Sequence, residues 1–211
     1  MTLLGRDDLE RAMFDEPDLD KRLIITPLLE REQIGRGAVD LRLGTEFLLL
    51  QRTRRPGLDA SSDSQERVDD IQERVVVPFG EKLWLHPGHF VLAATLEYLR
   101  LPDNMAAYVV GRSSWGRVGL IVATAVFVHP GFRGCLTLEL VNDGDSPIAL
   151  APGLRIAQLA VHQLATVAPA REGEEDKYVA PVRPQPSRLA SEQSDFDRLN
   201  TLGGALDSRL G

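Results

Sequence analysis

The sequence holds one cysteine, Cys135, among 211 residues, so no disulfide can form within the chain. A lone thiol cannot build a cysteine-rich zinc site, and the zinc-deaminase signature H-x-E followed by P-C-x-x-C is missing. The chain also lacks a Walker loop and a G-x-S-x-G nucleophile motif. These absences argue against catalysis by bound zinc, and the single cysteine makes a reducing cytoplasm the expected compartment.

Long apolar runs and positive charge are also scarce. No segment approaches the roughly 20 consecutive apolar residues of a membrane-spanning helix. Lysines and arginines number 24 against 31 acidic residues, which gives a formal net charge of −7, and no basic block is longer than Arg54-Arg55. A broad surface that follows a nucleic-acid backbone is therefore not expected. A small anionic ligand held by a few arginines is compatible with this charge pattern.

What the sequence does contain is a series of short strands. From residue 75 onward, β-prone runs alternate with turn signals about every 8–12 residues. Three Pro-Gly pairs, at 87–88, 130–131 and 152–153, mark tight turns between these runs. The spacing predicts a mainly β sandwich or barrel rather than alternating strand–helix units.

The flanking segments have a different composition. Residues 5–16 predict a short amphipathic helix with Asp7 as its cap. Residues 51–74 are polar and predict a long insertion loop. After residue 168 the chain is polar and rich in proline, which predicts a tail over 169–211 and leaves the β domain at 1–168.

The stretch GRSSWGR, residues 111–117, places charge, hydroxyls and glycine between two apolar runs. Arg112 and Arg117 can each pair with phosphate oxygens through two N–H groups, and the glycines let the backbone approach a ligand. The alternative is a surface loop whose arginines form ordinary salt bridges. Spacing alone supports both interpretations equally.

A second candidate is Glu139 in the stretch CLTLELVN. Alternation along a strand places three leucines on one face, and Thr137 and Glu139 on the other. A carboxylate is costly to bury without a partner. Glu139 therefore belongs either to a solvated outer face or to a cleft, where nearby arginines would tune it as a general acid and base.

His86 and His89 flank a H-P-G-H turn, a spacing that suits a metal ion. No cysteine or carboxylate follows at ligand spacing, so a structural role is expected for both histidines.

Four longer stretches resemble the dCTP deaminase family of the trimeric dUTPase superfamily. In chain order they are AVDLRLGTEF, LHPGHFVLAATLEYLRLPDNMAAYVVGRSSWGRVGL, HPGFRGCLTLELVNDGDSPIALAPGLRIAQL and KYVAPVRPQPSR. The resemblance covers about residues 3–190, nearly the whole chain. It implies a distorted jelly-roll β-barrel with a short N-terminal helix, assembled as a homotrimer with nucleotide sites between the subunits.

The same resemblance implies deamination of dCTP to dUTP without a catalytic metal, with Mg²⁺ carried by the triphosphate and no zinc. Glu139 matches the glutamate that activates water, and Ser113 and Arg117 match residues that position this water. The implied nucleotide-binding residues are Arg112, Ser113, Ser114, Trp115, Gly116, Arg117, His129, Thr137, Leu138, Glu139, Gln158 and Lys177. The tail is expected to close over the triphosphate.

The chain departs from the family pattern at several positions. His129, in VHPG, replaces the aspartate of the usual I-D-P-G, which accepts the sugar 3′-hydroxyl. The segment 120–128, part of which lines the base pocket, is one residue short and lacks the usual histidine. In the tail, Pro181 replaces a triphosphate-binding glutamine, and Ala170 occupies the place of a tyrosine. The phosphate loop and Glu139 are retained.

Three functions follow as hypotheses. The first is dCTP deamination. The second is a dUTPase-type diphosphohydrolase, alone or combined with deamination, although the dUTPase-type aspartate that would activate water at phosphorus corresponds to His129 here. The third is a divergent nucleotide-binding trimer with altered or lost activity.

Overall fold

The computed structural model describes residues 1–51, 57–59, 69–123, 127–167, 180–189, 193–194, 197–198 and 201. The chain divides into two compact units. The first comprises Met1–Leu48 and Val75–Gln185, and the second comprises Leu49–Arg74 and Pro186–Gly211. Every candidate site residue that the structure describes lies in the first unit.

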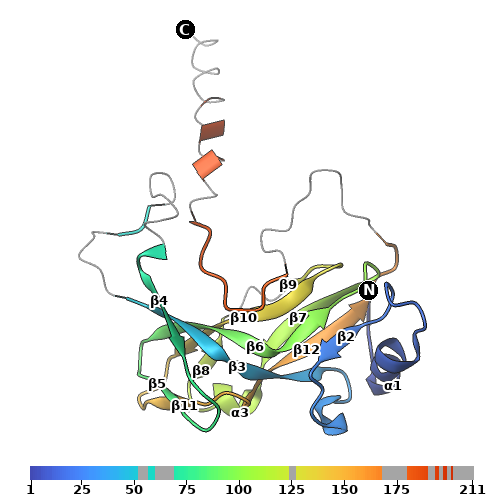
Figure 1. The fold of residues 1–211 in the computed structure, drawn as a ribbon, viewed down its shortest axis with the longest axis horizontal. Helices are drawn as coiled ribbons and strands as arrows, with labels where there is room; N and C mark the ends of the chain where they lie inside the picture. The colour runs from blue at the N-terminus through green and yellow to red at the C-terminus, as the bar shows by residue number, and fades with distance from the viewer. Residues whose placement is uncertain are drawn as a thin grey trace. The chain divides into compact units, whose positions relative to one another are not determined.

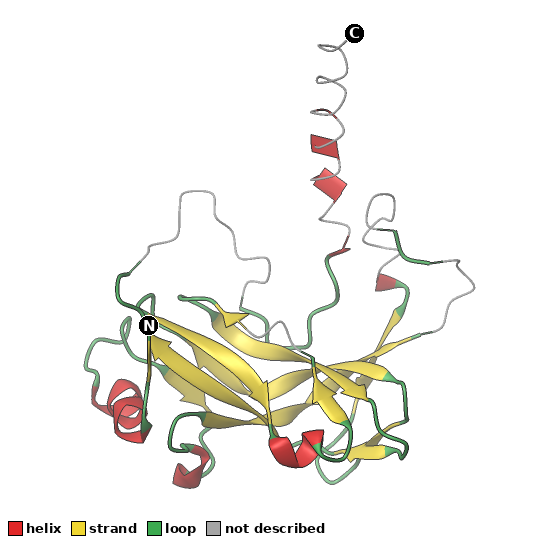
Figure 2. Ribbon diagram, turned by 180° about the vertical axis from the view of Figure 1, so that it is seen from behind, coloured by secondary structure: helices red, strands yellow, loops and turns green. Residues whose placement is uncertain are grey.

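The described residues are mainly β-strand, as the sequence predicts. The elements, in chain order, are β1 (Thr2–Leu3), α1 (Arg6–Glu10), a π-helical turn η1 (Arg11–Asp15), β2 (Ile24–Thr26), a 3-10 turn η2 (Arg31–Gln33), β3 (Val39–Leu50), β4 (Gln72–Val76), β5 (Leu83–Leu85), β6 (Phe90–Arg100), β7 (Met105–Gly111), α3 (Ser113–Gly116), β8 (Leu120–Val122), β9 (Phe127–Val128), β10 (Arg133–Asn142), β11 (Ile148–Leu150) and β12 (Arg155–Gln163). The short helices α1 and α3 of the first unit lie at the margins of its strands (Figure 2).

The strand order explains how residues far apart in the sequence become neighbours. Within the described part of the chain, the main sheet runs β8-β10-β6-β3-β12-β7-β9, with β1, β2 and β4 added at β12, β6 and β3 (Figure 1). Strands β5 and β11 form a separate pair. Strand β12 therefore lies between β3 and β7, and β10 lies between β6 and β8.

Alternating side chains of the long strands build the core. On β10, Leu136, Leu138 and Leu140 are 8%, 0% and 0% exposed, whereas Thr137 and Glu139 are half-buried. The predicted division of this strand into two faces is confirmed. Burying each such leucine contributes about 1.5–3 kcal/mol relative to leaving it in water.

The predicted turns are confirmed as well. Gly88, Gly131 and Gly153, the second residues of the three Pro-Gly pairs, adopt φ angles of 73°, 77° and 88°. Glycine reaches this left-handed region without the clash that a Cβ atom creates, so each pair can reverse the chain tightly.

The N-terminal helix forms where predicted, but its cap differs. Gly5 precedes the first helical residue, and its N–H donates to Asp8 Oδ2 at 3.3 Å. Asp7 lies inside the first turn, where its charge is favourable beside the N-terminal end of the helix dipole. The prediction of Asp7 as the cap is therefore wrong. No helix of the described residues has the length and apolar character needed to cross a membrane.

Strand β3 is one continuous strand from Val39 to Leu50. Strand β4, which pairs with it, begins at Gln72, inside the segment predicted as an insertion loop. The Gln51 N–H donates to the Ile71 carbonyl at 2.7 Å, which ties the two ends of this segment together. The intervening residues 52–56 and 60–68 lie outside the described part of the chain.

Residues 181–185, here called the tail strap, run along the edge of β10. The Cys135 N–H donates to the Pro181 carbonyl at 2.6 Å, and the Gln185 N–H donates to Thr137 Oγ1 at 3.0 Å. A Cβ atom at Gly134 would lie 2.5 Å from Pro181 Cδ, so only glycine fits beneath the strap. This part of the predicted tail is packed against the sheet.

Gly119 connects α3 to β8, and its substitution tests how tightly this turn is built. Its φ is +90°, and a Cβ atom there would lie 2.5 Å from the Gly144 backbone. We expect Gly119→Ala to lower the free energy of unfolding by about 1–3 kcal/mol because the backbone must move. Urea unfolding measures this loss.

Gly116→Ala is the matched control. Gly116 lies in α3, and nothing lies within 4 Å of a Cβ atom built there. Alanine is favoured over glycine in a helix by about 0.5–1 kcal/mol, so this variant should be at least as stable as the parent chain. Equal stability of the two variants would contradict the role given to Gly119.

Candidate active site

The GRSSWGR stretch forms the short helix α3 and the turns on either side of it. Arg112 precedes α3 in extended conformation, and its N–H donates to the Ile156 carbonyl at 3.2 Å. The Trp115 indole N–H donates to the Arg155 carbonyl at 2.8 Å. These bonds attach α3 to β12, while Ser113, Ser114 and Arg117 are exposed. The stretch is therefore an anchored surface feature with its hydroxyls available.

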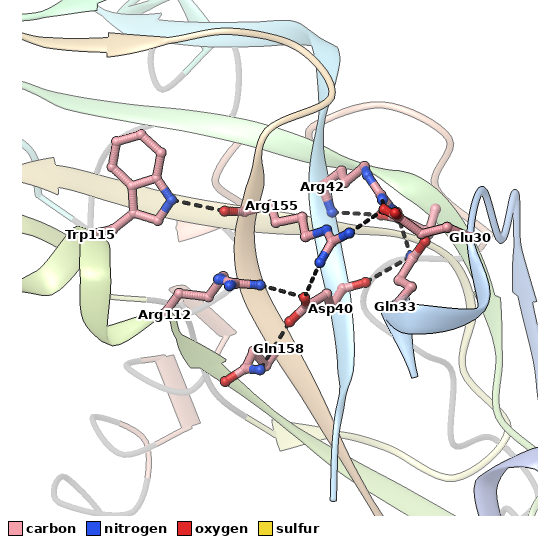
Figure 3. Close-up of polar contacts among 9 residues, drawn as sticks. Glu30, Gln33, Asp40, Arg42, Arg112, Trp115, Arg155 and Gln158 are labelled. Atoms are coloured by element: carbon pink, nitrogen blue, oxygen red, sulfur yellow. Dashed lines mark hydrogen bonds and ion pairs between the residues drawn. The ribbon is translucent and has the colours of Figure 1, made fainter. Parts of the chain in front are cut away.

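A carboxylate from another strand lies at the base of this feature. Arg112 forms an ion pair with Asp40 of β3. Arg155 Nη1 lies 3.3 Å from the same carboxylate oxygen, and the Gln158 amide donates to the other oxygen at 2.9 Å (Figure 3). Two predicted nucleotide-binding residues, Arg112 and Gln158, are thus brought together through Asp40.

A second buried carboxylate, Glu97 of β6, lies deeper in the same unit. Its side chain is 0% exposed and accepts from the Arg42 N–H at 2.8 Å and from the Gln33 amide at 2.9 Å. Arg42 Nη1 lies 3.5 Å from it. Burial raises the pKa of Glu97, and the Arg42 N–H opposes this effect.

Glu30 joins the two carboxylates into one network. It forms ion pairs with both Arg42 and Arg155 (Figure 3). The result is an alternation of acid and base that we call the ion-pair ladder, in the order Glu97, Arg42, Glu30, Arg155, Asp40 and Arg112. Through this ladder, the buried interior is connected to the residue that precedes α3.

Glu139 lies on β10, half-buried, and burial raises its pKa. Its carbonyl accepts from the Ala123 N–H at 2.8 Å, one residue beyond β8. At the other end of β8, Leu120 pairs with Asn142 and directly follows the α3 turn. At about 3.3 Å per residue, Leu120 and Ala123 are roughly 10 Å apart. In one chain, α3 and Glu139 therefore lie at opposite ends of β8.

The other residues predicted to bind the nucleotide lie away from α3 or outside the described part of the chain. Thr137 shares the face of Glu139 and accepts from the tail strap. The Leu138 side chain is 0% exposed, so only its backbone is available to a nucleotide, and its role stays a prediction. His129 is exposed, with its ring edge-on to Phe127 at 4.8 Å. Lys177 lies outside the described residues.

Of the other departures from the family pattern, the structure places Pro181 and part of the shortened segment. The carbonyl of Pro181 is taken by β10 within the tail strap. Residues 124–126 of the shortened segment and Ala170 lie outside the described part of the chain.

The His86 and His89 rings are 5.9 Å apart, and the described residues contain no group of three side chains suited to hold a metal ion.

Asp40, Glu30, Glu97 and Arg155 were not predicted as site residues. The stretch AVDLRL contains one indication of a buried polar network, because Asp40 and Arg42 alternate there with apolar residues. In a strand buried on both faces, such charged residues need partners. The sequence pattern does not identify those partners.

Comparisons with known proteins agree on one family. A family model described as dCTP deaminase-like matches residues 7–164. The chain is 40% identical over 172 residues to a dUMP-forming dCTP deaminase of Methanobrevibacter smithii, covering 80% of this chain and 88% of that protein. It is 40% identical over 195 residues to a dCTP deaminase of Natronomonas pharaonis, covering 90% and 96%. It is 42% identical over 151 residues to a dUMP-forming dCTP deaminase of Dictyoglomus turgidum, covering 71% and 76%.

The fold also resembles a solved structure, the 2′-deoxycytidine 5′-triphosphate deaminase from Agrobacterium tumefaciens. The TM-score is 0.57 at 22% sequence identity, and the match covers 76% of this chain and 46% of that chain. At this identity the likeness concerns the fold, and it agrees with the predicted β architecture.

The ion-pair ladder can be tested at its deepest member. Glu97→Gln keeps the shape of the side chain but removes the charge that faces Arg42. Because the change removes the buried partner of Arg42 and leaves only the more exposed Glu30 as its ionic partner, we expect the free energy of unfolding to fall by about 1–3 kcal/mol. Urea unfolding is the measurement, with Glu32→Gln on the exposed side of η2 as the control. Equal stability of the two variants would show that the ladder does not stabilise the fold.

Proposed function

The chain belongs to the dCTP deaminase-like family, and on this basis we propose that it hydrolyses dCTP to dUTP and ammonia. The observation that carries the proposal is the family match over residues 7–164, together with about 40% identity to dCTP deaminases over most of their length. The placement of Arg112 and Gln158 on one carboxylate, and of Glu139 on the outer face of β10, is consistent with it.

Glu139 is the proposed general base and acid. Its carboxylate takes a proton from water as the water oxygen bonds to C4 of cytosine. Glu139 delivers this proton to N3 as the C4=N3 double bond opens, and then carries the remaining hydroxyl proton to the amino group. The C4–N bond breaks and ammonia leaves, and the C4 carbonyl and the N3–H of uracil form. A carboxylate whose pKa is raised by burial is a stronger base than an exposed one.

The residues around α3 are proposed to hold the rest of the substrate. Ser113 and Arg117 would orient the water and stabilise the tetrahedral centre by hydrogen bonds prepared in advance. Arg112, Ser114 and the backbone of α3 would bind the triphosphate, which carries Mg²⁺ as part of the substrate.

A homotrimer with the site between subunits is also part of the proposal. Glu139 and α3 lie at opposite ends of β8 in one chain, so a second copy is a natural source of the missing half. Val110, Val118 and Ile121, which precede and follow α3, are 44%, 57% and 44% exposed. Covering such apolar side chains in an interface is favourable. A cytoplasmic location stays a prediction from the single cysteine.

A second function is favoured by the names of two relatives, the dUMP-forming deaminases of Methanobrevibacter smithii and Dictyoglomus turgidum. In this case dUTP would be hydrolysed further to dUMP and pyrophosphate. His129 stands against it, because an imidazole replaces the carboxylate that would activate water at phosphorus.

One assay separates these functions. Purified protein is incubated with dCTP, dUTP or CTP in the presence and absence of Mg²⁺, and the nucleotides, ammonia and pyrophosphate are quantified. Ammonia with dUTP supports simple deamination, and ammonia with dUMP and pyrophosphate supports the combined reaction. Release of neither product from any of the three nucleotides would overturn the proposal.

Glu139→Gln tests the role of the general base. Without a group to take the proton from water, we expect kcat for deamination to fall by about 10²–10⁴-fold. Binding of dCTP, measured by isothermal titration calorimetry, should change little because the side chain keeps its size. Glu81→Gln, on an exposed turn, is the control and should keep full activity. Undiminished turnover in Glu139→Gln would remove Glu139 from the mechanism.

The pH dependence of kcat provides an independent test. Burial raises the pKa of Glu139 above its ordinary value of 4.5, and the base works only when ionised. Activity should therefore decline as pH falls through this raised value, with the acid limb centred above 4.5. Rates measured at constant ionic strength give this limb. A limb at or below 4.5 would contradict the assignment.

A further inference from the structure

The proposed mechanism assigns no role to the buried carboxylate of Asp40. Asp40 is 7% exposed, and both of its oxygens have partners. Arg112 and Arg155 approach one oxygen, and Gln158 donates to the other (Figure 3). One arginine would be enough to balance its charge. The convergence of three donors therefore needs a further explanation.

The register of the sheet shows how Asp40 reaches these donors. Gln158 of β12 pairs with Asp40 of β3 on one side and with Val110 of β7 on the other. These three residues consequently lie in one row across the sheet. Arg112 follows two residues after Val110, at the start of α3. Asp40 thus connects β3, across β12, to the residue that introduces the GRSSWGR turn.

This connection fixes a side chain that would otherwise be mobile. A free arginine loses rotamer entropy when a ligand orders it, and a pre-ordered arginine avoids that cost. The Arg112 side chain is 30% exposed, and a guanidinium carries five N–H donors. The donors not used by Asp40 therefore remain available to an anion.

We propose that Asp40 is a positioning residue, which holds Arg112 and Gln158 in the geometry in which they bind the polyphosphate of the nucleotide. The proposal rests on the proposed function for the identity of the ligand. A positioning role and a purely structural role predict opposite changes in the affinity for an anion when Asp40 is replaced. If Asp40 only balanced charge, removing its negative charge would strengthen the binding of an anion. If it positions the donors, removing it weakens that binding.

Inorganic tripolyphosphate is the probe, because it carries the anionic chain without a base or sugar. Its Kd is measured by calorimetry for the full chain and for Asp40→Asn, well below the unfolding transition of each. We expect Kd to rise about tenfold, the loss of roughly one charge-assisted hydrogen bond. An unchanged or lower Kd would overturn the proposal.

Glu30→Gln is the matched control. It removes a carboxylate from the same ladder, but Glu30 contacts Arg155 and Arg42 and not Arg112 or Gln158. Its Kd for tripolyphosphate should stay within about twofold of the parent value. A tenfold rise in this control as well would show that loss of any ladder charge weakens binding, and would overturn the specific role of Asp40.

A double-mutant cycle tests whether Asp40 acts through Arg112. In the Arg112→Ala background, the further change Asp40→Asn should cost far less affinity than it does in the parent chain. Equal losses in both backgrounds would mean that the two residues act independently, and would overturn the proposal. In steady-state kinetics with dCTP, the Asp40→Asn variant should show a raised KM with a smaller change in kcat. A fall in kcat alone would indicate a smaller folded fraction and would count against the proposal.

If Asp40→Asn does not fold, Asp40→Glu replaces it. The longer side chain keeps the charge and moves the carboxylate, so the Kd for tripolyphosphate should still rise. An unchanged Kd in Asp40→Glu would overturn the proposal. Failure of the parent chain to deaminate dCTP would defeat the proposed function alone, because the tripolyphosphate measurements do not depend on turnover.

Discussion

The structure depends on placing ionised side chains in the interior next to opposite charges. Asp40 and Glu97 are nearly or fully buried, and an unpaired ion at such depth costs several kcal/mol. Each is surrounded by donors that come from other elements of the fold. Because Arg42 and Arg155 are each shared between two carboxylates, no member of the ion-pair ladder can move alone. The packing of η2, β3, β6 and β12 is consequently interdependent.

Strand β10 serves the core and the candidate active site with one alternating pattern. Its leucines fill the interior, and the residues between them face outward. Packing of those leucines fixes the position of the β10 backbone that carries Glu139. The Glu139 side chain is half-buried, and this burial raises its pKa.

Local sequence patterns predicted much of the fold. The strand alternation, the Pro-Gly turns and the outward face of Glu139 each depend on residues close together in the chain, and each is found in the structure. The partners of Asp40 were not predictable in this way. Arg155 lies 115 residues from Asp40, and only the sheet register brings the two together. Charge pattern indicates that a buried carboxylate needs a donor, but it does not say which donor is near.

The start of the N-terminal helix is a second feature that the local sequence pattern did not predict correctly. Asp7 and Gly5 both suit the position before a helix, and a composition rule prefers Asp7. The choice follows instead from the approach of the preceding chain, in which the Arg6 N–H donates to the Arg36 carbonyl at 3.2 Å. A tertiary contact therefore decides where the helix begins.

The tail strap has a consequence for the behaviour of the chain among other chains. An open strand edge offers N–H and carbonyl groups to any extended segment and so promotes aggregation. Here the Cys135 N–H already donates to the Pro181 carbonyl, and proline has no backbone N–H to donate to a further strand. The bare Gly134 beneath it keeps the strap in close contact. This part of the tail thus protects the β10 edge from strand addition by foreign chains.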